Sequence, residues 1–171
     1  MHIVGNEKWA VIRMLIMDFD GVLTDGHVFV NQEGNEWVRC SRRDGLGIEL
    51  LQKNGLEACV ISKETNPVVR ARCQKMGIAC FQGVDDGGGK LEIMKRIMQE
   101  KGLSIEQVAY MGDDINDREP LEHAGLGITV ADGHPAVKKV ADYITTTRGG
   151  EDAVREVCEK ILLAQGIPVR L

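Results

Sequence analysis

Residues 11–25 have the sequence VIRMLIMDFDGVLTD, and the architecture of the whole chain can be worked out from them. The first seven residues, up to Met17, are mostly apolar and are soon followed by Gly21, which predicts a short buried strand. Because side chains alternate along a strand, the carboxylates of Asp18 and Asp20 start on one face, and the turn at Gly21 brings both over the strand end. In an open α/β sheet this carboxyl end is where ligands bind.

Paired carboxylates at such a place suit three tasks. They can hold a hard cation such as Mg²⁺. One of them can attack phosphorus and become an aspartyl phosphate. One can carry the proton of a leaving alcohol. A solvated strand end would explain Asp18 and Asp20 taken alone, so later residues have to decide between these interpretations.

Length and composition narrow the class of protein. With 171 residues, the chain is expected to form a single domain, 1–171. A hydrophobic content of 43% predicts a compact globular fold. The net charge is -5 and the basic residues form no block, which argues against nucleic acid as a partner. An anionic substrate would therefore need local Lys, Arg or a metal ion to offset the overall charge.

The five cysteines form no CxxC pair and are odd in number, which is typical of reduced thiols in a cytosolic protein. No apolar run approaches the ~20 residues of a membrane span. Residues 1–9 lack the core of a signal peptide. We therefore expect a soluble, cytoplasmic protein that has no membrane partner.

Predicted strands and helices alternate after the first strand. The strands are expected at 56–61, 78–81, 108–111, 126–130 and 143–144, and the helices at 44–54, 67–76, 90–101, 135–140 and 151–164. Asp44 is expected to cap the first of these helices, and Asn66 the second. This alternation predicts an α/β fold of three layers, in which a parallel sheet is covered by helices on both faces.

A projecting β-hairpin is predicted at about 26–41, with its turn at Asn31-Gln-Glu-Gly34. Its apolar residues are Val28, Val30, Trp37 and Val38. A lone two-stranded hairpin is marginally stable in water. We expect it to pack against a neighbouring subunit, and packing on its own domain is the alternative.

Polar residues follow four successive predicted strands: Asp18/Asp20, Ser62, Lys90 and Asp113/Asp114/Asp117. All would meet at one edge of a parallel sheet. Phosphoryl transfer needs little beyond positioning and charge neutralisation, which these residue types supply. Singly they are weak signals, because a Ser after a strand is usually a turn residue and the later acids could cap a helix. Together and in this order they favour phosphoryl transfer.

These four motifs resemble those of the haloacid dehalogenase superfamily. The chain is similar in particular to its small, capless phosphatases of 3-deoxy-2-ketosugar acids, from about residue 14 to 165. The residues that carry this closer resemblance are Thr24-Asp25-Gly26, Arg43-Asp44-Gly45, Gln82-Gly83, Gly112-Asp113-Asp114-Ile-Asn-Asp117, Ala141-Asp142-Tyr143 and Gly149-Gly150-Glu-Asp-Ala-Val-Arg155-Glu.

The resemblance implies an Mg²⁺-dependent phosphatase in which Asp18 is the nucleophile and Asp20 the general acid/base. Ser62 and Lys90 would bind phosphate. Asp18, Asp113 and the backbone carbonyl of Asp20 would hold the metal. The resemblance also implies a homotetramer in which the hairpins build a central barrel and a neighbouring subunit covers each active site.

The resemblance leaves the sugar acid open between octulosonate 8-phosphate and nonulosonate 9-phosphate. Glu64, Arg72 and Lys75 stand where the nine-carbon branch carries substrate-binding residues, and a solvated helix face is the alternative. The Leu162-Leu-Ala-Gln-Gly166 ending is more similar to the eight-carbon branch. The nine-carbon substrate is slightly favoured.

The chain departs from the family pattern at two places. Lys63 stands where a glycine is expected, and Gly87-Gly88-Gly89 lengthens the loop before Lys90. The longer loop keeps open a non-catalytic oligomerisation module, such as the one attached to some sugar cytidylyltransferases. A phosphatase of another small ester is disfavoured because no cap-sized insertion follows the first motif. A receiver-type signalling domain would carry its acids in a different order.

Overall fold

The structure is a computed structural model that describes residues 5–85 and 89–169. Its strands are β1 (Met14–Met17), β2 (Thr24–Val30), β3 (Glu36–Cys40), β4 (Glu57–Ser62), β5 (Ala79–Gln82), β6 (Val108–Gly112), β7 (Leu126–Thr129) and β8 (Tyr143–Ile144). Its α-helices are α1 (Asn6–Ala10), α2 (Arg42–Lys53), α3 (Pro67–Met76), α4 (Gly89–Lys101), α5 (Arg118–His123), α6 (Pro135–Lys138) and α7 (Ala153–Ala164). Two 3₁₀ turns are η1 (Ile105–Gln107) and η2 (Ile115–Asp117).

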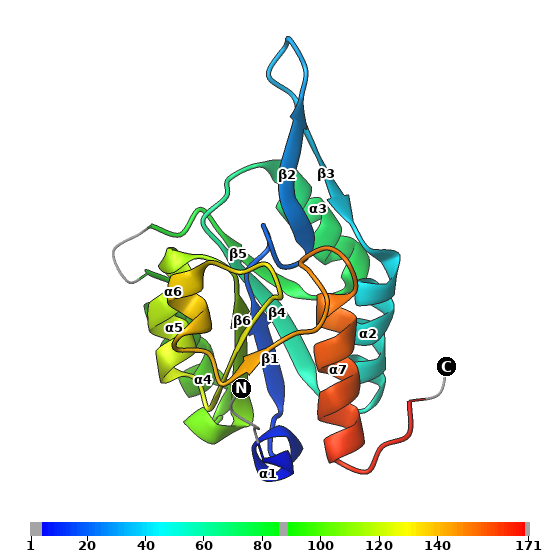
Figure 1. Cartoon of the computed structure of the whole chain (residues 1–171), viewed down its shortest axis with the longest axis vertical. Helices are drawn as coiled ribbons and strands as arrows, with labels where there is room; N and C mark the ends of the chain where they lie inside the picture. The colour runs from blue at the N-terminus through cyan, green and yellow to red at the C-terminus, as the bar shows by residue number, and fades with distance from the viewer. Residues whose placement is uncertain (1–4, 86–88, 170–171) are drawn as a thin grey trace.

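The main sheet has six strands in the order β5-β4-β1-β6-β7-β8. Each neighbouring pair in it is parallel. β1 lies between β4 and β6, so the strand that leads into Asp18 sits in the middle of the sheet (Figure 1). The predicted parallel sheet is therefore confirmed. Its inner strands β1, β6 and β7 are buried along their whole length, whereas the edge strands β5 and β8 are partly exposed.

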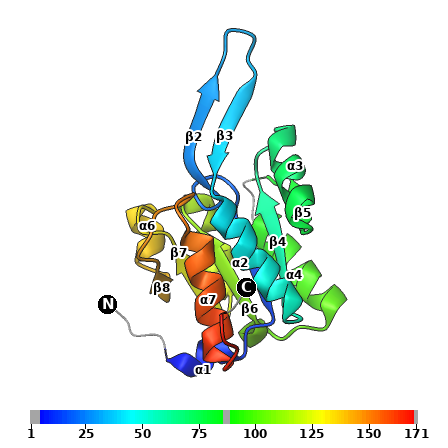
Figure 2. The same ribbon diagram turned by 90° about the vertical axis from the view of Figure 1, so that its right-hand side faces the viewer.

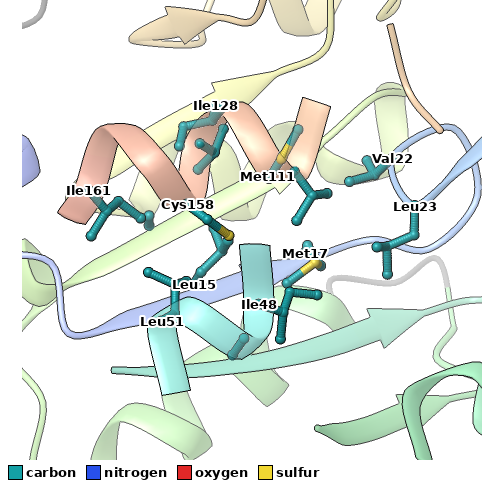
Figure 3. Packing of buried hydrophobic residues seen from close by; sticks show 14 of the residues in the cluster. Leu15, Met17, Val22, Leu23, Ile48, Leu51, Met111, Ile128, Cys158 and Ile161 are labelled. Atoms are coloured by element: carbon teal, nitrogen blue, oxygen red, sulfur yellow. The ribbon is translucent and has the colours of Figure 1, made fainter. Parts of the chain in front are cut away.

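Helices cover the two faces of the sheet and form the outer layers. Leu15 and Met17 point into one hydrophobic cluster, which α1, α2, α3 and α7 complete. Met14 and Ile16 point into the other, beneath α4, α5 and α6. Figure 3 shows the first cluster, where Leu15 and Met17 lie among side chains of α2 and α7. The alternation of side chains along β1 thus supplies both cores.

Two helix starts differ from the sequence-based expectation. The prediction that Asp44 caps a helix was wrong, because α2 begins two residues earlier and the side chain of Ser41 accepts from the backbone N–H of Arg43. Asp44 instead lies buried in the first turn, where its Oδ1 accepts from the N–H of Arg155 at 2.9 Å. The prediction that Asn66 caps α3 is confirmed.

The N-terminal helix α1 was not expected. It is only five residues long, and Trp9 is its buried side chain. The indole meets the ring of Tyr143 edge-on, with centroids 5.1 Å apart. The predicted first strand begins at Met14 rather than Val11, because the chain between α1 and β1 is a turn.

Strands β2 and β3 form the predicted antiparallel hairpin, with bounds of 24–40. Figure 2 shows the hairpin standing away from the body of the molecule, beyond the carboxyl end of the sheet. Its exposed large side chains are Val28, Phe29, Val30 and Trp37, of which Phe29 is 67% exposed. Within the described part of the chain, these four side chains stay open to solvent.

The turn after Asp20 packs against the segment that leads into α7. The backbone N–H of Gly150 donates to the carbonyl oxygen of Val22 at 2.9 Å. A Cβ on Gly149 would lie 1.7 Å from the carbonyl oxygen of Gly21, so this position has room for glycine alone. The segment at residues 149–150, just before α7, therefore supports the loop that carries Asp20.

Over residues 5–85 and 89–169, the chain forms no helix of the length and apolar character needed to cross a bilayer.

Candidate active site

A cavity of about 790 Å³ opens at the carboxyl edge of the sheet. Asp18 and Asp20 line it from the loop after β1, and Asp113 lines it from the loop after β6. Lys90 reaches it from the first turn of α4, and Lys63 from the loop after β4. Residues of these four loops therefore meet at one edge of the sheet, as predicted, but the loop after β4 lines the cavity with Lys63 and not with the predicted Ser62.

Lys90 joins two carboxylates below this cavity. Its Nζ donates to Oδ2 of Asp18 and to Oδ1 of Asp117, each at 2.7 Å. All three residues are buried. Charges of this kind are stable in an interior only when they are paired, so the three side chains must act as one unit. Of the glycines predicted to lengthen the loop before Lys90, Gly87 and Gly88 lie outside the described residues, and Gly89 is the first residue of α4.

Asp18 is held firmly at the end of β1. Its N–H donates to the carbonyl oxygen of Met111 at 2.9 Å, and its Oδ1 accepts from the N–H of Phe19 at 2.7 Å. Burial raises the pKa of Asp18 well above the usual range and Asp117 adds to the rise, while Lys90 opposes it. Burial lowers the pKa of Lys90, but Asp18 and Asp117 outweigh it and keep the ammonium charged.

Asp117 was missed as a site residue, because its place after a strand could be explained by helix capping. Its Oδ1 also accepts from the hydroxyl of Tyr110 at 2.7 Å, and its Oδ2 accepts from the N–H groups of Asp113 at 3.1 Å and Asp114 at 3.4 Å. Tyr110 is fully buried, and a buried tyrosine hydroxyl needs a partner. The sequence did contain a signal for this contact, because Asp117 follows the strand residue Tyr110 by seven positions.

Asp18, Asp113 and Asp117 form a candidate cation site, because one carboxylate oxygen from each lies within 4.8 Å of the other two. Oxygen donors of this kind suit Mg²⁺. Burial is the largest cause that raises the pKa of Asp113 to about 7, and the negative charges of Asp117 and Asp114 add to the rise. The residues therefore fit a divalent cation. The carboxylate of Asp20 is not part of this group. The predicted contact of Asp20 with the metal therefore depends on its backbone carbonyl, and it stays a prediction.

Asp20 lies beside this group, on the cavity wall, and is half-buried. Burial and then the nearby carboxylate of Glu64 raise its pKa, while a hydrogen bond with Thr24 opposes the rise. The hydroxyl of Thr24 also accepts from the N–H of Gly21 at 3.2 Å. Asp20 is therefore positioned by its own loop and is biased toward holding a proton, as a general acid must.

Ser62 ends β4 and is buried, but it is not among the residues that line the cavity. Its Oγ accepts from the N–H of Glu64 at 3.1 Å and so shapes the loop. Its predicted contact with phosphate stays a prediction.

The three residues predicted to bind the sugar acid do not line the cavity of their own subunit, although the carboxylate of Glu64 is near enough to Asp20 to raise its pKa. Oε1 of Glu64 accepts from the backbone N–H groups of Thr65 at 2.6 Å and Asn66 at 2.8 Å. Nη2 of Arg72 donates to the carbonyl oxygen of Ser41 at 2.8 Å. Lys75 is exposed on α3. Their roles toward substrate stay predictions.

Comparison with known proteins gives consistent matches. Residues 48–157 match the family of haloacid dehalogenase-like hydrolases. The chain is 40% identical to the 3-deoxy-D-manno-octulosonate 8-phosphate phosphatase of Escherichia coli K12 over 156 residues, which are 91% of this chain and 81% of that protein.

Solved structures of phosphatases are also similar to this chain. The phosphatase of the same name from Moraxella catarrhalis, in complex with magnesium, phosphate and a KDO molecule, superposes with a TM-score of 0.89 at 38% identity, covering 94% of this chain and 91% of that one. The cobalt-bound phosphatase of Haemophilus influenzae gives a TM-score of 0.87 at 36% identity, covering 93% and 92%.

The magnesium ion in the Moraxella structure and the acidic group at Asp18, Asp113 and Asp117 confirm the prediction of an Mg²⁺ cofactor. The receiver and non-catalytic alternatives are set aside, since the three relatives named above are phosphatases. The chain belongs to the haloacid dehalogenase-like hydrolases, and within that family it is a phosphatase acting on phosphoric monoesters.

Proposed function

We propose that the chain hydrolyses a 3-deoxy-2-ketosugar-acid phosphate, with 3-deoxy-D-manno-octulosonate 8-phosphate as its substrate. The observation that carries the proposal is the buried Asp18–Lys90–Asp117 unit at the floor of the cavity, in a chain 40% identical to a phosphatase of that sugar acid. The nine-carbon alternative depends on Glu64, Arg72 and Lys75. The eight-carbon substrate is preferred because the relatives from Escherichia coli and Moraxella catarrhalis are phosphatases of octulosonate 8-phosphate.

In the first step, a carboxylate oxygen of Asp18 attacks phosphorus and the bond from phosphorus to the sugar oxygen breaks. Lys90 holds Oδ2 of Asp18 and presents positive charge where the phosphoryl group arrives. The carboxyl group of Asp20 gives its proton to the departing sugar oxygen. The products of this step are the free sugar acid and an aspartyl phosphate on Asp18.

In the second step, Asp20 is a carboxylate and takes a proton from water as that water attacks phosphorus. The bond from phosphorus to Asp18 breaks and inorganic phosphate leaves. Asp117 has no contact with the reacting bond in this scheme, because its oxygens hold Lys90, Tyr110 and the loop amides in place. A bound Mg²⁺ would supply positive charge that offsets the negative charge of the phosphoryl oxygens.

Steady-state phosphate release tests this proposal. Octulosonate 8-phosphate and nonulosonate 9-phosphate would be compared at equal concentrations, with Mg²⁺ and with EDTA. We expect Mg²⁺-dependent turnover and a preference for the 8-phosphate. A preference for the 9-phosphate would transfer the assignment to the nine-carbon branch, and release from neither would refute the sugar-acid assignment.

The protein is also proposed to work as a homotetramer in which hairpins from neighbouring subunits pack together. Support comes from the exposed apolar side chains of β2 and β3, which a soluble monomer would leave in water. The test of this assembly is given below.

A further inference from the structure

Tyr110 lies in the middle of β6 and brings a hydroxyl group into the hydrophobic cluster beneath α4, α5 and α6. The residue is fully buried. It is in register with Ile16 of β1, two residues before Asp18, so Tyr110 and Asp18 lie on the same face of the sheet. Helix α4, which supplies Lys90, covers this face. The hydroxyl is therefore placed among the charged groups of the active site.

The partner of this hydroxyl is Asp117, whose carboxylate is surrounded by donors. Its Oδ1 accepts from the hydroxyl of Tyr110 and from Nζ of Lys90, each at 2.7 Å. Its Oδ2 accepts from the N–H groups of Asp113 at 3.1 Å and Asp114 at 3.4 Å. A carboxylate offers about four lone-pair sites, so these four donors fill it.

The side chain of Asp117 is packed tightly against β6. A Cβ on Gly112 would lie 2.3 Å from Cβ of Asp117, so Asp117 occupies the space that a side chain on the strand would need. Its two amide donors also hold it in place. Lys90, in contrast, carries its ammonium group on a flexible stem of four carbons. If the donors around Asp117 change, Lys90 is therefore the group that moves.

The position of Lys90 depends on how strongly its two carboxylate partners attract it. The hydroxyl of Tyr110 takes one acceptor direction of Oδ1 and offsets part of the charge of Asp117. Without this hydroxyl, Asp117 would attract the ammonium group more strongly. The bond from Nζ of Lys90 to Oδ2 of Asp18, which is 2.7 Å long, would then weaken.

We propose that Tyr110 is a positioning residue for phosphoryl transfer: its hydroxyl, acting through Asp117, holds Lys90 against Asp18. This inference rests on the aspartyl-phosphate mechanism of the proposed function and deepens it, because Lys90 presents its charge where the phosphoryl group arrives. Tyr110 does not line the cavity, so it acts through these neighbours and not on the substrate.

The substitution Tyr110→Phe removes the hydroxyl and keeps the ring. A displaced Lys90 weakens an interaction that is made in the transition state, so kcat and kcat/KM should fall together by about 10- to 100-fold, with little change in KM. The measurement is phosphate release from octulosonate 8-phosphate and from p-nitrophenyl phosphate at saturating Mg²⁺. Circular dichroism gives the folded fraction, and kcat is expressed per folded molecule.

A matched control is Tyr143→Phe. The hydroxyl of Tyr143 also donates to a carboxylate oxygen at 2.7 Å, that of Glu156, but Tyr143 lies on β8 at the edge of the sheet and does not line the cavity. Both substitutions remove one bond of the same kind and should lower the urea midpoint of unfolding. Only Tyr110→Phe should lower kcat.

A second readout requires neither turnover nor a change at Tyr110. The sequence contains two tyrosines, so Tyr110 is the only one left in Tyr143→Phe. Incorporation of 3-fluorotyrosine then gives a single ¹⁹F resonance, beside the hydroxyl that meets Asp117. A cation bound at Asp18, Asp113 and Asp117 changes the charge that these donors share, so the resonance should move as Mg²⁺ is added.

An unchanged kcat per folded molecule in Tyr110→Phe would overturn the inference, because the hydroxyl would then serve the fold alone. An equal fall of kcat in Tyr143→Phe would also overturn it. If Tyr110→Phe does not fold, the resonance decides, and one that stays fixed at saturating Mg²⁺ would overturn the inference.

Failure of the proposed function is seen in the wild type, before any substitution is made. A wild type that hydrolyses p-nitrophenyl phosphate but not octulosonate 8-phosphate would refute the sugar-acid substrate. The comparison of Tyr110→Phe with Tyr143→Phe would then still test the inference on the ester that is hydrolysed. A wild type that hydrolyses neither ester would overturn both.

Discussion

Asp18 combines two features that rarely coexist in one side chain, because it is buried and yet it is proposed to attack a substrate. Lys90 makes this possible, since its ammonium group pairs with Oδ2 at 2.7 Å while the cavity opens beside it. Asp117 holds Lys90 from the other side. The proposed chemistry thus depends on a charged group of three side chains that is assembled before substrate and metal bind.

The substitution Asp18→Asn tests the nucleophile. An amide oxygen can still accept from the N–H of Phe19 but cannot form the aspartyl phosphate, so turnover should fall by at least about 1,000-fold. The measurement is phosphate release at saturating substrate and Mg²⁺. A circular dichroism melt should show that the fold persists, and either substantial turnover or loss of the fold would contradict the role given to Asp18.

Asp44 predicts a pH dependence of stability. Its burial raises the pKa to about 6, whereas the bond from the N–H of Arg155 opposes the rise. Because the folded-state pKa is above the unfolded value near 3.9, the contribution of Asp44 to stability is full below pH 4 and is lost as pH rises through about 6. The ionised carboxylate of Asp44 therefore lowers the free energy of unfolding at neutral pH.

The substitution Asp44→Asn removes this cost and keeps an acceptor for Arg155. At pH 7.5 the variant should be more stable than the wild type by roughly 2 kcal/mol, and the gain should shrink toward pH 4.5. Urea unfolding of both proteins at the two pH values, in EDTA, gives the comparison. An equal difference at both pH values would show that Asp44 does not titrate in this range.

Much of the site could be predicted at the level of single residues. Asp18, Asp20, Lys90 and Asp113 were found because parallel strands bring their carboxyl ends together whatever the side chains do. The role of Asp117 could not be predicted from strand ends alone, because it depends on which buried groups face it.

At the scale of elements, the hairpin is the feature least explained by its own subunit. The side chains of Phe29 and Trp37 are directly paired across β2 and β3, and both are exposed. They form an apolar strip that water solvates poorly. Contact with the hairpins of neighbouring subunits would cover it.

The double substitution Phe29→Ser with Trp37→Ser should therefore weaken assembly. We expect the wild type to elute as a tetramer in size-exclusion chromatography with light scattering, and the variant to shift to smaller species. The substitution Leu163→Ser is a matched control, because Leu163 is also exposed but lies on α7. Identical masses for all three proteins would refute hairpin-mediated assembly.

Element boundaries show what the sequence could and could not determine. Continuous apolar runs predicted the buried strands because both faces of the sheet are covered. The start of α2 was misplaced because Ser41 and Asp44 are both good capping residues, and the contact of Asp44 with Arg155, 111 residues away, decides between them. Helix α1 was missed because five residues with one buried side chain leave no periodic signal.

At the scale of the whole molecule, metal binding should stabilise the fold. Binding to the folded state alone contributes about 2.7 kcal/mol at a hundredfold excess over Kd. For a chain of 171 residues this corresponds to a rise in Tm of roughly 5–10 °C.

Thermal melts in EDTA and in saturating Mg²⁺ measure this rise. The substitution Asp113→Asn removes one carboxylate of the group with Asp18 and Asp117 and should abolish most of it. A full shift that persists in this variant would place the stabilising ion elsewhere.

The contact of Gly149 and Gly150 with the turn at Gly21 and Val22 links residues 128 positions apart, and it matters while the protein is being made. A ribosome delivers Asp18 and Asp20 early, but the segment that supports their loop is among the last to emerge. A nascent chain can assemble much of its sheet before that point, yet it has no finished catalytic loop. A translation product that stops before Gly149 is therefore expected to be inactive.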